Sequence, residues 1–334
     1  MDPASEAQTT DGVLMIRPCS FGWNAETAAS NTYQSRPQEP PPRIQQQARQ
    51  EFAGLHALLL QHEVTVTVLD DLPDPPAPDA VFPNNWFSTH VDGTLVLYPM
   101  AAVNRRGERR PTHLAALRQA LGDGRLIDLT DFEARGKFLE GTGSLVLDRV
   151  HRIAYAAESA RTDRVVVEAF ARALGYRPLL FSTVRQKGQP IYHTNVVMAI
   201  GTQAAVVCLE AIAEGSQRES VAASIRQSGR KLIAITLAQL AQFAGNLLEL
   251  RSRRGAALWV MSSRAFHALD NAQRQQLAAG ATLLHSPLPT IESVGGGSAR
   301  CMLAELFRQR APSGTYYSTK REEMASRHQA AYKQ

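Results

Sequence analysis

A recurring order of predicted elements constrains the fold of this 334-residue chain more than any other feature. Four consecutive segments each read as two paired strands, a helix and a third strand. The first begins with a hairpin over residues 86–98, which turns at Asp92-Gly93. A fifth copy is completed if the segment after Cys301 joins the N-terminal strand, helix and strand. Repeats of this length predict a closed radial array of α/β units. The alternative is an ordinary α+β domain whose spacing is a coincidence.

The predicted elements follow from hydrophobic periodicity and from the turn residues between them. The N-terminal part supplies a strand at 13–17, a long polar loop at 22–42, a helix at 43–61 and a strand at 64–69. In the four copies, the predicted strands lie at 86–90, 95–98, 125–129, 144–147, 153–157, 178–181, 195–200, 204–209, 232–235, 247–250, 257–261 and 282–284. The predicted helices lie at 112–121, 164–174, 217–228 and 265–279.

One candidate residue stands just before or at the first strand of each copy. These residues are Asn85, Glu140, His193, Asn246 and Cys301, and their separations are 55, 53, 53 and 55 residues. Equivalent positions of a closed array lie at the same end of its central axis, so we expect the five side chains to meet in one pocket. A carboxylate, an imidazole and a thiol are among them, which is the set that nucleophilic catalysis needs.

Cys301 is the predicted nucleophile because three successive glycines precede it closely and let a substrate approach the backbone. The segment 302–307 looks helical. A thiol at a helix N-terminus, with Arg300 beside it, would be favoured as the thiolate. Cys208 lies in an apolar run and is predicted to be an inert buried residue, as is Cys19.

The other candidates have chemistry that fits a small polar substrate. His193 can exchange protons near neutral pH, and Glu140, which is followed by glycines, can hold the imidazole or accept hydrogen bonds from substrate nitrogen. Asn85 and Phe82 belong to the unusual string Phe-Pro-Asn-Asn-Trp. Arg161 precedes a predicted helix, where its planar guanidinium could bind a substrate carboxylate.

Composition excludes several functional classes. Hydrophobic residues make up 44% of the chain and charged residues 20%, which favours a folded domain over a disordered chain. The net charge is +5, but the basic residues are scattered apart from the run 105–110, which contains a glutamate, so nucleic-acid binding is not predicted. We find no signal peptide and no membrane-spanning stretch, and three cysteines suit a reducing cytoplasm. Metal-ligand and phosphate-binding motifs are absent, so we expect neither a metal nor a cofactor.

Four strings together resemble the amidinotransferase and arginine-deiminase-like superfamily, also called the pentein superfamily. They are FPNNW from residue 82, EGTGS from residue 140, YHTN from residue 192 and GGGSARC, which ends at Cys301. The match is closest to the branch of citrulline-utilisation hydrolases, or citrulline ureidases. The resemblance implies a five-bladed α/β propeller of ββαβ repeats with pseudo-five-fold symmetry. It also implies a single catalytic domain over 13–310, between a loose segment 1–12 and a tail 311–334.

The resemblance also implies a covalent mechanism. Cys301 matches the family nucleophile that attacks the central carbon of a guanidinium or ureido group. His193 matches the general acid and base, and Glu140 matches the carboxylate beside it. Arg161 lies in a string similar to one whose arginine binds the substrate α-carboxylate. Asn85 and Asn195 align with two positions where arginine-processing members carry aspartate.

We therefore predict a cytoplasmic hydrolase that converts citrulline to ornithine, carbon dioxide and ammonia. Its expected partner is the small-molecule substrate, with no nucleic acid or membrane, and a homo-oligomer is compatible with the sequence. The rival functions are arginine deiminase, an arginine dihydrolase, an amidinotransferase and, in another class, a catalytically dead propeller that serves as a binding module. The loop 22–42, with Asn24, Glu26, Thr27 and Asn31, is a candidate lid.

Overall fold

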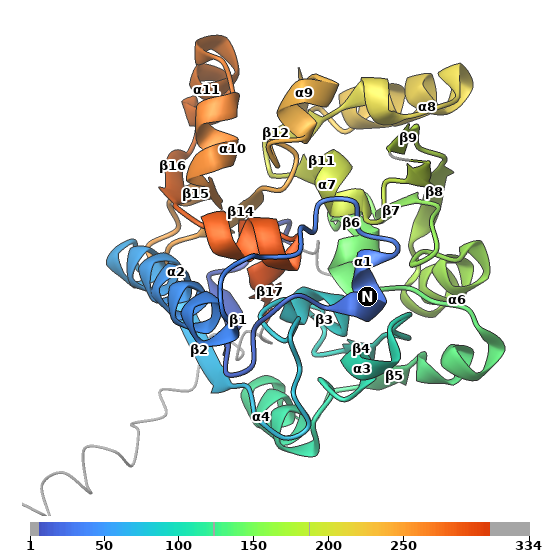
Figure 1. Cartoon of the computed structure of the whole chain (residues 1–334). Coiled ribbons are helices and arrows are strands. Elements are labelled where there is room, and N and C mark those ends of the chain that lie inside the picture. Colours follow the sequence, from blue (N-terminus) through green and yellow to red (C-terminus); the bar gives the residue numbers. More distant parts are fainter. Residues whose placement is uncertain (1–6, 123, 187, 308–334) are drawn as a thin grey trace, which may run out of the picture.

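The computed structural model describes residues 7–122, 124–186 and 188–307. Within these residues, five three-stranded sheets share one pattern, in which the middle strand pairs antiparallel with one neighbour and parallel with the other. Figure 1 shows the sheets set around a common centre, with the longer helices on the outside. The α/β units predicted from the sequence are therefore present.

Each sheet takes its strands from one repeat. In chain order, the first four sheets are β3 (Phe87–Thr89), β4 (Leu95–Leu97) and β5 (Leu126–Asp128); β6 (Leu145–Asp148), β7 (Ile153–Ala157) and β8 (Arg177–Phe181); β11 (Met198–Ile200), β12 (Ala204–Val207) and β13 (Lys231–Ala234); and β14 (Leu248–Arg251), β15 (Ala257–Ser262) and β16 (Thr282–Ser286). The fifth sheet joins β17 (Ala304–Glu305), β1 (Gly12–Arg17) and β2 (Thr65–Asp70). A short hairpin pairs β9 (Arg185–Gln186) with β10 (Gln189–Pro190).

The helices fall into long outer helices and short turns. The long helices are α2 (Pro41–Gln61), α4 (Pro111–Leu121), α6 (Arg164–Leu174), α8 (Gly215–Gln227) and α11 (Asn271–Ala278). The short ones are α1 (Ala25–Ala28), α3 (Val103–Arg106), α5 (Gly141–Ser144), α7 (Thr194–Val197), α9 (Leu237–Leu240) and α10 (Ser263–Ala268). The 3₁₀ turns are η1 (Pro83–Asn85), η2 (Thr130–Arg135), η3 (Leu209–Ala211) and η5 (Ala299–Met302), and η4 (Ile291–Gly295) is a π-helical turn.

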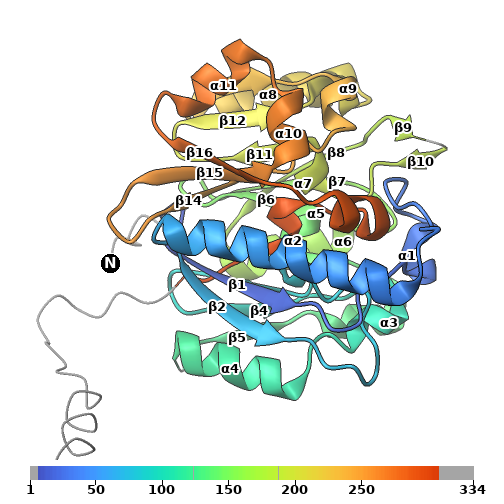
Figure 2. The same ribbon diagram turned by 60° about the vertical axis from the view of Figure 1, so that its left-hand side comes forward.

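The two ends of the described chain build the fifth sheet together. β17 pairs antiparallel with β1, and β1 pairs parallel with β2, as expected if the segment after Cys301 completes the fifth copy. Figure 2 shows α2 lying along this sheet. The helix predicted over 302–307 is wrong, because the backbone N–H of Leu306 donates to the Gly12 carbonyl at 2.8 Å and the segment is extended. Pairing with β1 overrides the local helical pattern.

Two further boundaries differ from the predicted ones. α2 begins at Pro41, two residues earlier than predicted, because a proline fits the first turn of a helix, where its missing N–H costs nothing. The helix predicted over 265–279 is divided into α10 and α11. Asp270 interrupts it as the N-cap of α11, and Asp270 and Gln273 form a capping box.

Residues 8–10 are held in the fold, which differs from the loose segment expected over 1–12. Gln8, Thr9 and Thr10 are buried, and Gln8 Nε2 donates to the carbonyl of Leu147 at 2.9 Å. Residues 1–6 and the expected tail 311–334 lie outside the described residues. No helix of the described part of the chain is long and apolar enough to cross a membrane.

Neighbouring sheets are also joined by a buried ion pair. Arg230, directly before β13, donates to both carboxylate oxygens of Asp148 in β6, at 2.7 and 3.1 Å, and both side chains are almost fully buried. The Nε of Arg230 donates to the Gly201 carbonyl at 2.6 Å. A buried pair of this kind is costly to break, because the remaining charge stays desolvated.

We predict that Arg230→Met lowers the free energy of unfolding by about 3 kcal/mol, because it leaves Asp148 buried without its main partner. Arg17→Met is the matched control. It breaks a 2.6 Å pair with Asp70 in which the two side chains are 49% and 65% exposed, so the loss should stay below about 1 kcal/mol. Urea denaturation measures both variants, and equal losses would contradict this account.

Candidate active site

The five positions with regular spacing meet at one end of the central region. Asn85 ends η1, Glu140 and His193 directly precede α5 and α7, and Asn246 lies two residues before β14. Cys301 belongs to η5. The turn α5 packs against both η1 and α7, and η1 packs against η5. All five side chains are at most 3% exposed.

Gly143 in α5 lets these turns approach closely. A Cβ atom added to Gly143 would lie 2.5 Å from Nδ2 of Asn85 and 2.7 Å from Nδ1 of His193. Real Cβ atoms are not found that close to other heavy atoms, so any other residue would push the two side chains apart. Gly143, one of the two glycines that follow Glu140, is therefore required by the packing around the candidate site.

The Cys301 thiol lies between two asparagine amides. Nδ2 of Asn246 is 3.3 Å from Sγ, and Nδ2 of Asn195 is 3.5 Å from it. The expected helix N-terminus is replaced by the short turn η5. Arg300 is turned to other partners, because its guanidinium donates to the Glu305 carboxylate and to the Leu303 carbonyl, both at 2.8 Å. The predicted helix N-terminus is therefore absent, and Arg300 interacts electrostatically with Cys301 without a hydrogen bond to its sulfur.

His193 is bonded to Glu140, which is one of the two roles considered for this carboxylate and the one that the resemblance implies. Nε2 of His193 lies 2.8 Å from Oε2 of Glu140. This bond fixes Nε2 as the protonated nitrogen, and no described residue is hydrogen-bonded to Nδ1. Burial lowers the pKa of His193 to about 4, against the opposing effect of Glu140. The imidazole is therefore neutral near pH 7.

Glu140 is held as a carboxylate by several partners. Burial by itself would raise the pKa of Glu140, but Arg161 and the hydrogen bond from His193 outweigh it and hold the pKa well below its usual range. Nη1 of Arg161 lies 3.3 Å from Oε2, and the backbone N–H of Ala101 donates to Oε1 at 3.1 Å. Glu140 thus carries its negative charge throughout the neutral pH range.

Arg161 lines the cavity, but three of the five N–H groups of its guanidinium side chain are already hydrogen-bonded. Nη2 donates to the Thr27 carbonyl at 2.8 Å and Nε to Ser30 Oγ at 2.9 Å, while Nη1 donates to Glu140. The guanidinium carbon also lies 5.0 Å from the ring centre of Tyr192. Arg161 therefore ties the loop 22–42 to the buried carboxylate.

Three charged residues of the site, Arg105, Glu108 and Asp79, were not among the predicted site residues. Arg105 is buried, and its Nη1 donates to Oδ1 of Asn85 at 2.7 Å. The Glu108 carboxylate accepts two hydrogen bonds from Arg105, at 2.8 and 3.0 Å. Oδ2 of Asp79 lies 3.9 Å from Nε of Arg105. Asp79 stands three residues before Phe82 in the string that drew attention to this region, and Arg105 opens the basic run. The sequence did not indicate that Asp79 and Arg105 are buried, and their burial is the feature that would have marked them as site residues.

Unpaired buried oxygens mark where a ligand could bind. Oδ1 of Asp79 and Oδ1 of Asn195 are buried and have no hydrogen-bond partner, although Oδ2 of Asp79 accepts from Asn24 at 2.8 Å and from Thr27 at 3.0 Å. Buried polar atoms are rarely left without a partner, so these two acceptors suit donors supplied by a substrate.

The cavity between these groups is small and covered. It measures about 10 Å³, which is about the room for one water molecule. It is lined by Thr27, Asn31, Asp79, Phe82, Asn85, Arg105, Arg161, Tyr192, His193, Gly295, Gly297 and Cys301. Of the other predicted residues, Asn195, Asn246 and Glu140 bond to lining residues without lining the cavity themselves, so three of the five regularly spaced residues line it.

The loop 22–42 covers the cavity. Asn31 Nδ2 donates to the Gly296 carbonyl at 3.2 Å, and the backbone N–H of Ser35 donates to the Ser293 carbonyl at 2.7 Å. Figure 1 shows the segment around α1 crossing in front of the centre. The cavity in this conformation is too small to hold an amino acid.

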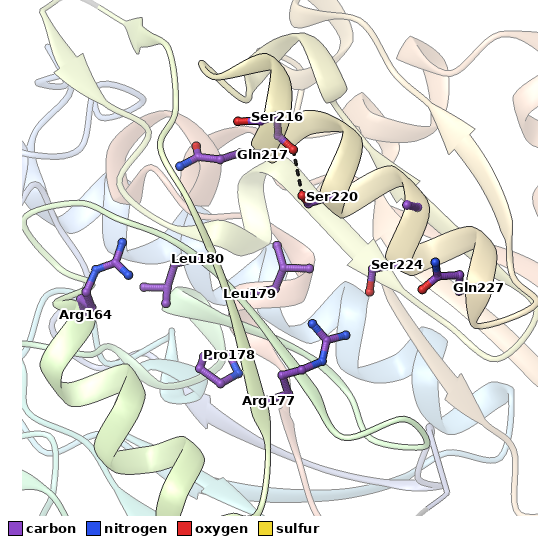
Figure 3. Close-up of a pocket in the computed structure, with 11 residues that line it drawn as sticks. Arg164, Arg177, Pro178, Leu179, Leu180, Ser216, Gln217, Ser220, Ser224 and Gln227 are labelled. Carbon is purple, nitrogen blue, oxygen red and sulfur yellow. Dashed lines mark hydrogen bonds between the residues drawn. The ribbon is translucent and has the colours of Figure 1, made fainter.

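A larger hollow, of about 570 Å³, lies elsewhere, between β8 and α8 (Figure 3). Its lining includes Arg177, Leu179, Ser220 and Ser224, and it contains no thiol, imidazole or carboxylate. Its serine hydroxyls therefore have no lining side chain that could act as a general base for nucleophilic catalysis. Within the described residues, no three His, Cys, Asp or Glu side chains are grouped as metal ligands.

Comparison with known proteins places this geometry in context. The sequence model of the family described as N,N dimethylarginine dimethylhydrolase, eukaryotic, matches residues 17–308. No curated protein sequence matches the chain. Solved structures share the fold. One is the product-bound N-terminal domain of ArgZ, an arginine dihydrolase from cyanobacteria, with a TM-score of 0.70 and 18% identity over 90% of this chain and 99% of that one.

Two further structures are similar at comparable identity. Unliganded AgrE has a TM-score of 0.69 and 20% identity, over 90% of this chain and 40% of that one. A variant of DDAH from Pseudomonas aeruginosa, in complex with citrulline, has a TM-score of 0.64 and 14% identity, over 89% of this chain and 99% of that one. At these identities the structures show the shared fold alone.

We predict that His193 makes stability sensitive to mild acid. Its folded pKa of about 4 lies below the ordinary value of 6.5, so the unfolded state takes up the proton first as the pH falls. The contribution of His193 to stability should therefore drop by about 2 kcal/mol between pH 7 and pH 5. Glu108, whose pKa burial raises to about 7, takes up a proton in the folded state over the same window and acts in the opposite direction, so the His193 contribution is read as the difference between wild type and a His193 variant. Glu140, whose pKa is lowered from an ordinary 4.5, titrates below this window.

The matched variant is His193→Gln, which keeps a neutral donor for Glu140 but cannot be protonated. Urea denaturation at both pH values should show a smaller loss for this variant than for the wild type. Equal losses would contradict a neutral buried imidazole.

Proposed function

Because the chain belongs to the family described as eukaryotic N,N dimethylarginine dimethylhydrolase, within the pentein superfamily, we propose that it is a cysteine-dependent hydrolase. The proposed reaction centre is the ureido or guanidino carbon of a small amino acid. The observation that carries the proposal is the meeting of Cys301 and the bonded pair His193–Glu140 at one covered cavity with Asp79, whose second oxygen is unpaired.

The proposed chemistry proceeds through a covalent intermediate. With citrulline, the Cys301 thiol passes its proton to Nδ1 of His193 and the sulfur attacks the ureido carbon. The bond to the terminal nitrogen breaks, and His193 returns the proton so that ammonia leaves. Water, deprotonated by His193, then cleaves the thiocarbamate. The resulting carbamate collapses to ornithine and carbon dioxide.

Glu140 supports both steps without itself exchanging a proton. It holds Nε2 of His193 as the donor, which leaves Nδ1 as the proton acceptor. Each time the imidazole is protonated, the fixed carboxylate lies 2.8 Å away and stabilises the new positive charge. The low pKa of Glu140 keeps that charge available at neutral pH.

The amino-acid end of the substrate is proposed to lie toward the loop 22–42. Asp79 contacts Asn24 and Thr27 of that loop, and its unpaired Oδ1 suits an ammonium group. Arg161 would bind the carboxylate by exchanging its bonds to Thr27 and Ser30 when the loop opens and closes again. The loop is therefore proposed as a lid.

The head group is proposed to be a neutral ureido group, so citrulline is the preferred substrate. The amides of Asn85 and Asn195 supply both donors and acceptors, which a ureido group needs. A guanidinium is always cationic and would need a negative partner in a closed site. Glu140 is already shared by His193 and Arg161. Asp79 is then the acid that remains for the ammonium group.

One observation favours a second function, hydrolysis of arginine by a deiminase or dihydrolase. If Asp79 faced the head group instead of the ammonium group, its unpaired oxygen could balance a guanidinium. A transferase would require an amine acceptor at the covalent intermediate. The intact set of Cys301, His193 and Glu140 argues against a catalytically dead binding module.

We also propose that the five sheets are the blades of a closed propeller. The shared strand pattern and the pairing of β17 with β1 support this arrangement. The region 13–310 would then form one catalytic domain with its site on the axis.

We predict that Cys301→Ser reduces turnover on the order of 10³-fold or more, because a hydroxyl is far less acidic than a thiol and His193, with a pKa of about 4, is a weak base for removing its proton. The free energy of unfolding should change by less than about 1 kcal/mol, since the replacement is nearly isosteric. Cys208→Ser, at a buried cysteine that directly follows β12 and does not line the cavity, is the matched control and should retain activity. A Cys301→Ser enzyme that kept most of its rate would end the covalent mechanism.

We predict that citrulline has a higher kcat/KM than arginine, and that agmatine, which has no carboxylate, is a poor substrate. Ammonia, ornithine and citrulline are measured separately over a panel of citrulline, arginine, methylated arginines and agmatine. Asn195→Asp adds a carboxylate near the sulfur and should shift the kcat/KM ratio toward arginine by about 10-fold. A wild-type preference for arginine would favour the second function.

A further inference from the structure

Asn246 occupies the one position of the five that the proposed function leaves without a role. It is fully buried and has three partners. Its Nδ2 donates to the Asn195 carbonyl at 3.0 Å and to Cys301 Sγ at 3.3 Å, and its Oδ1 accepts from the Arg300 backbone N–H at 3.1 Å. The side chain therefore links two neighbouring turns to the sulfur.

The two backbone contacts determine which way the amide faces. A flipped amide would place Oδ1 against the Asn195 carbonyl and Nδ2 against the Arg300 N–H, so both contacts would become repulsive. Nδ2 is therefore the amide atom nearer to Cys301 Sγ, at 3.3 Å, while Oδ1 lies 3.8 Å from Sγ and accepts from it only while the thiol is protonated. Asn195 adds a second amide donor to the sulfur at 3.5 Å.

The thiolate has few other hydrogen-bonded partners. Arg300 is bonded to Glu305, and no helix begins at Cys301. Burial holds the pKa of His193 at about 4, so its imidazole is neutral in the free enzyme and does not form a strong ion pair with the sulfur. A thiolate in a closed site must still be stabilised by donors.

We propose that Asn246 is a catalytic residue, whose fixed amide donates to the Cys301 sulfur and raises the fraction of thiolate at neutral pH. This inference rests on the proposed role of Cys301 as nucleophile. The negative charge leaves the sulfur as the sulfur–carbon bond forms, and it returns when water cleaves the intermediate. The amide then stabilises the departing thiolate in the second step.

Other titratable and charged groups also face the sulfur. They are Arg105, Arg161, Asp79, Tyr192 and His193, which line the cavity, Glu140 behind His193, and Arg300 on the same turn, with Glu305 bonded to it. In the described structure none of these has a hydrogen bond to Sγ. A substitution of Asn246 leaves all of these charged groups in the protein. A change in the thiolate fraction of Cys301 in such a variant would therefore be due to the loss of the Asn246 amide.

The test is the rate of Cys301 alkylation by iodoacetamide over pH 5 to 10, in a Cys19→Ser background. Mass spectrometry of the peptide confirms the modified residue. We expect Asn246→Ala to slow alkylation at pH 7 by about 10-fold or more, and the rate should approach the wild-type rate at high pH. Asn246→Asp keeps an acceptor for the Arg300 N–H but removes the donor and adds a like charge, so its shift to higher pH should be larger.

Ser224→Ala removes a buried 2.8 Å bond to Tyr155 away from the site and is the control, with an unchanged pH profile expected. A folded Asn246→Ala protein with the wild-type pH midpoint would overturn the inference. If that variant does not fold, Asn246→Asp and Asn195→Ala decide the question, and wild-type midpoints in both would overturn it. Alkylation needs no substrate, so a failure to hydrolyse citrulline or arginine would count against the proposed function alone.

Discussion

The pairing of β17 with β1 is the contact on which the arrangement of the site depends. It joins the last described strand to the first, and it holds the turn that carries Cys301 against the central region. With the chain ends joined there, η5 packs against η1. Cys301 thereby reaches the cavity that Asn85 and His193 also line, although more than a hundred residues separate it from His193. A chain with these residues but without that pairing would have no reason to bring them together.

The electrostatics of the centre follow from this enclosure. Each charged group there is desolvated and therefore needs a partner. Glu140 is shared by His193 and Arg161, and Arg105 is shared by Asn85 and Glu108. The same enclosure keeps His193 neutral, so proton transfer, thiolate stabilisation and substrate charge must be provided by different side chains. This division of roles is what the proposed mechanism uses.

Much of this arrangement could be predicted from the spacing of the residues. A regular separation places residues at equivalent points of a repeated unit, and this alone was enough to group Glu140, His193, Asn246 and Cys301. The sheet order was predictable for the same reason. The helix expected after Cys301 was wrong because strand pairing with β1 is a long-range contact, which local periodicity does not report.

The remaining features depend on side-chain partners. Asp79 and Arg105 looked like ordinary charged residues in the sequence, and their burial beside Asn85 and Thr27 became visible only in three dimensions. The bonds from Arg161 to Thr27 and Ser30 likewise join segments far apart in the chain. No sequence spacing marks such contacts, because they do not repeat.

The central claim is that Cys301 forms a covalent bond to the ureido or guanidino carbon. The most direct measurement is rapid acid quenching during turnover of isotope-labelled citrulline and arginine, followed by mass spectrometry of the intact protein and of its peptides. The account predicts a transient adduct, equal to the substrate less ammonia, on the peptide that contains Cys301. Turnover with no adduct at any quench time, or with the adduct on another residue, would contradict it.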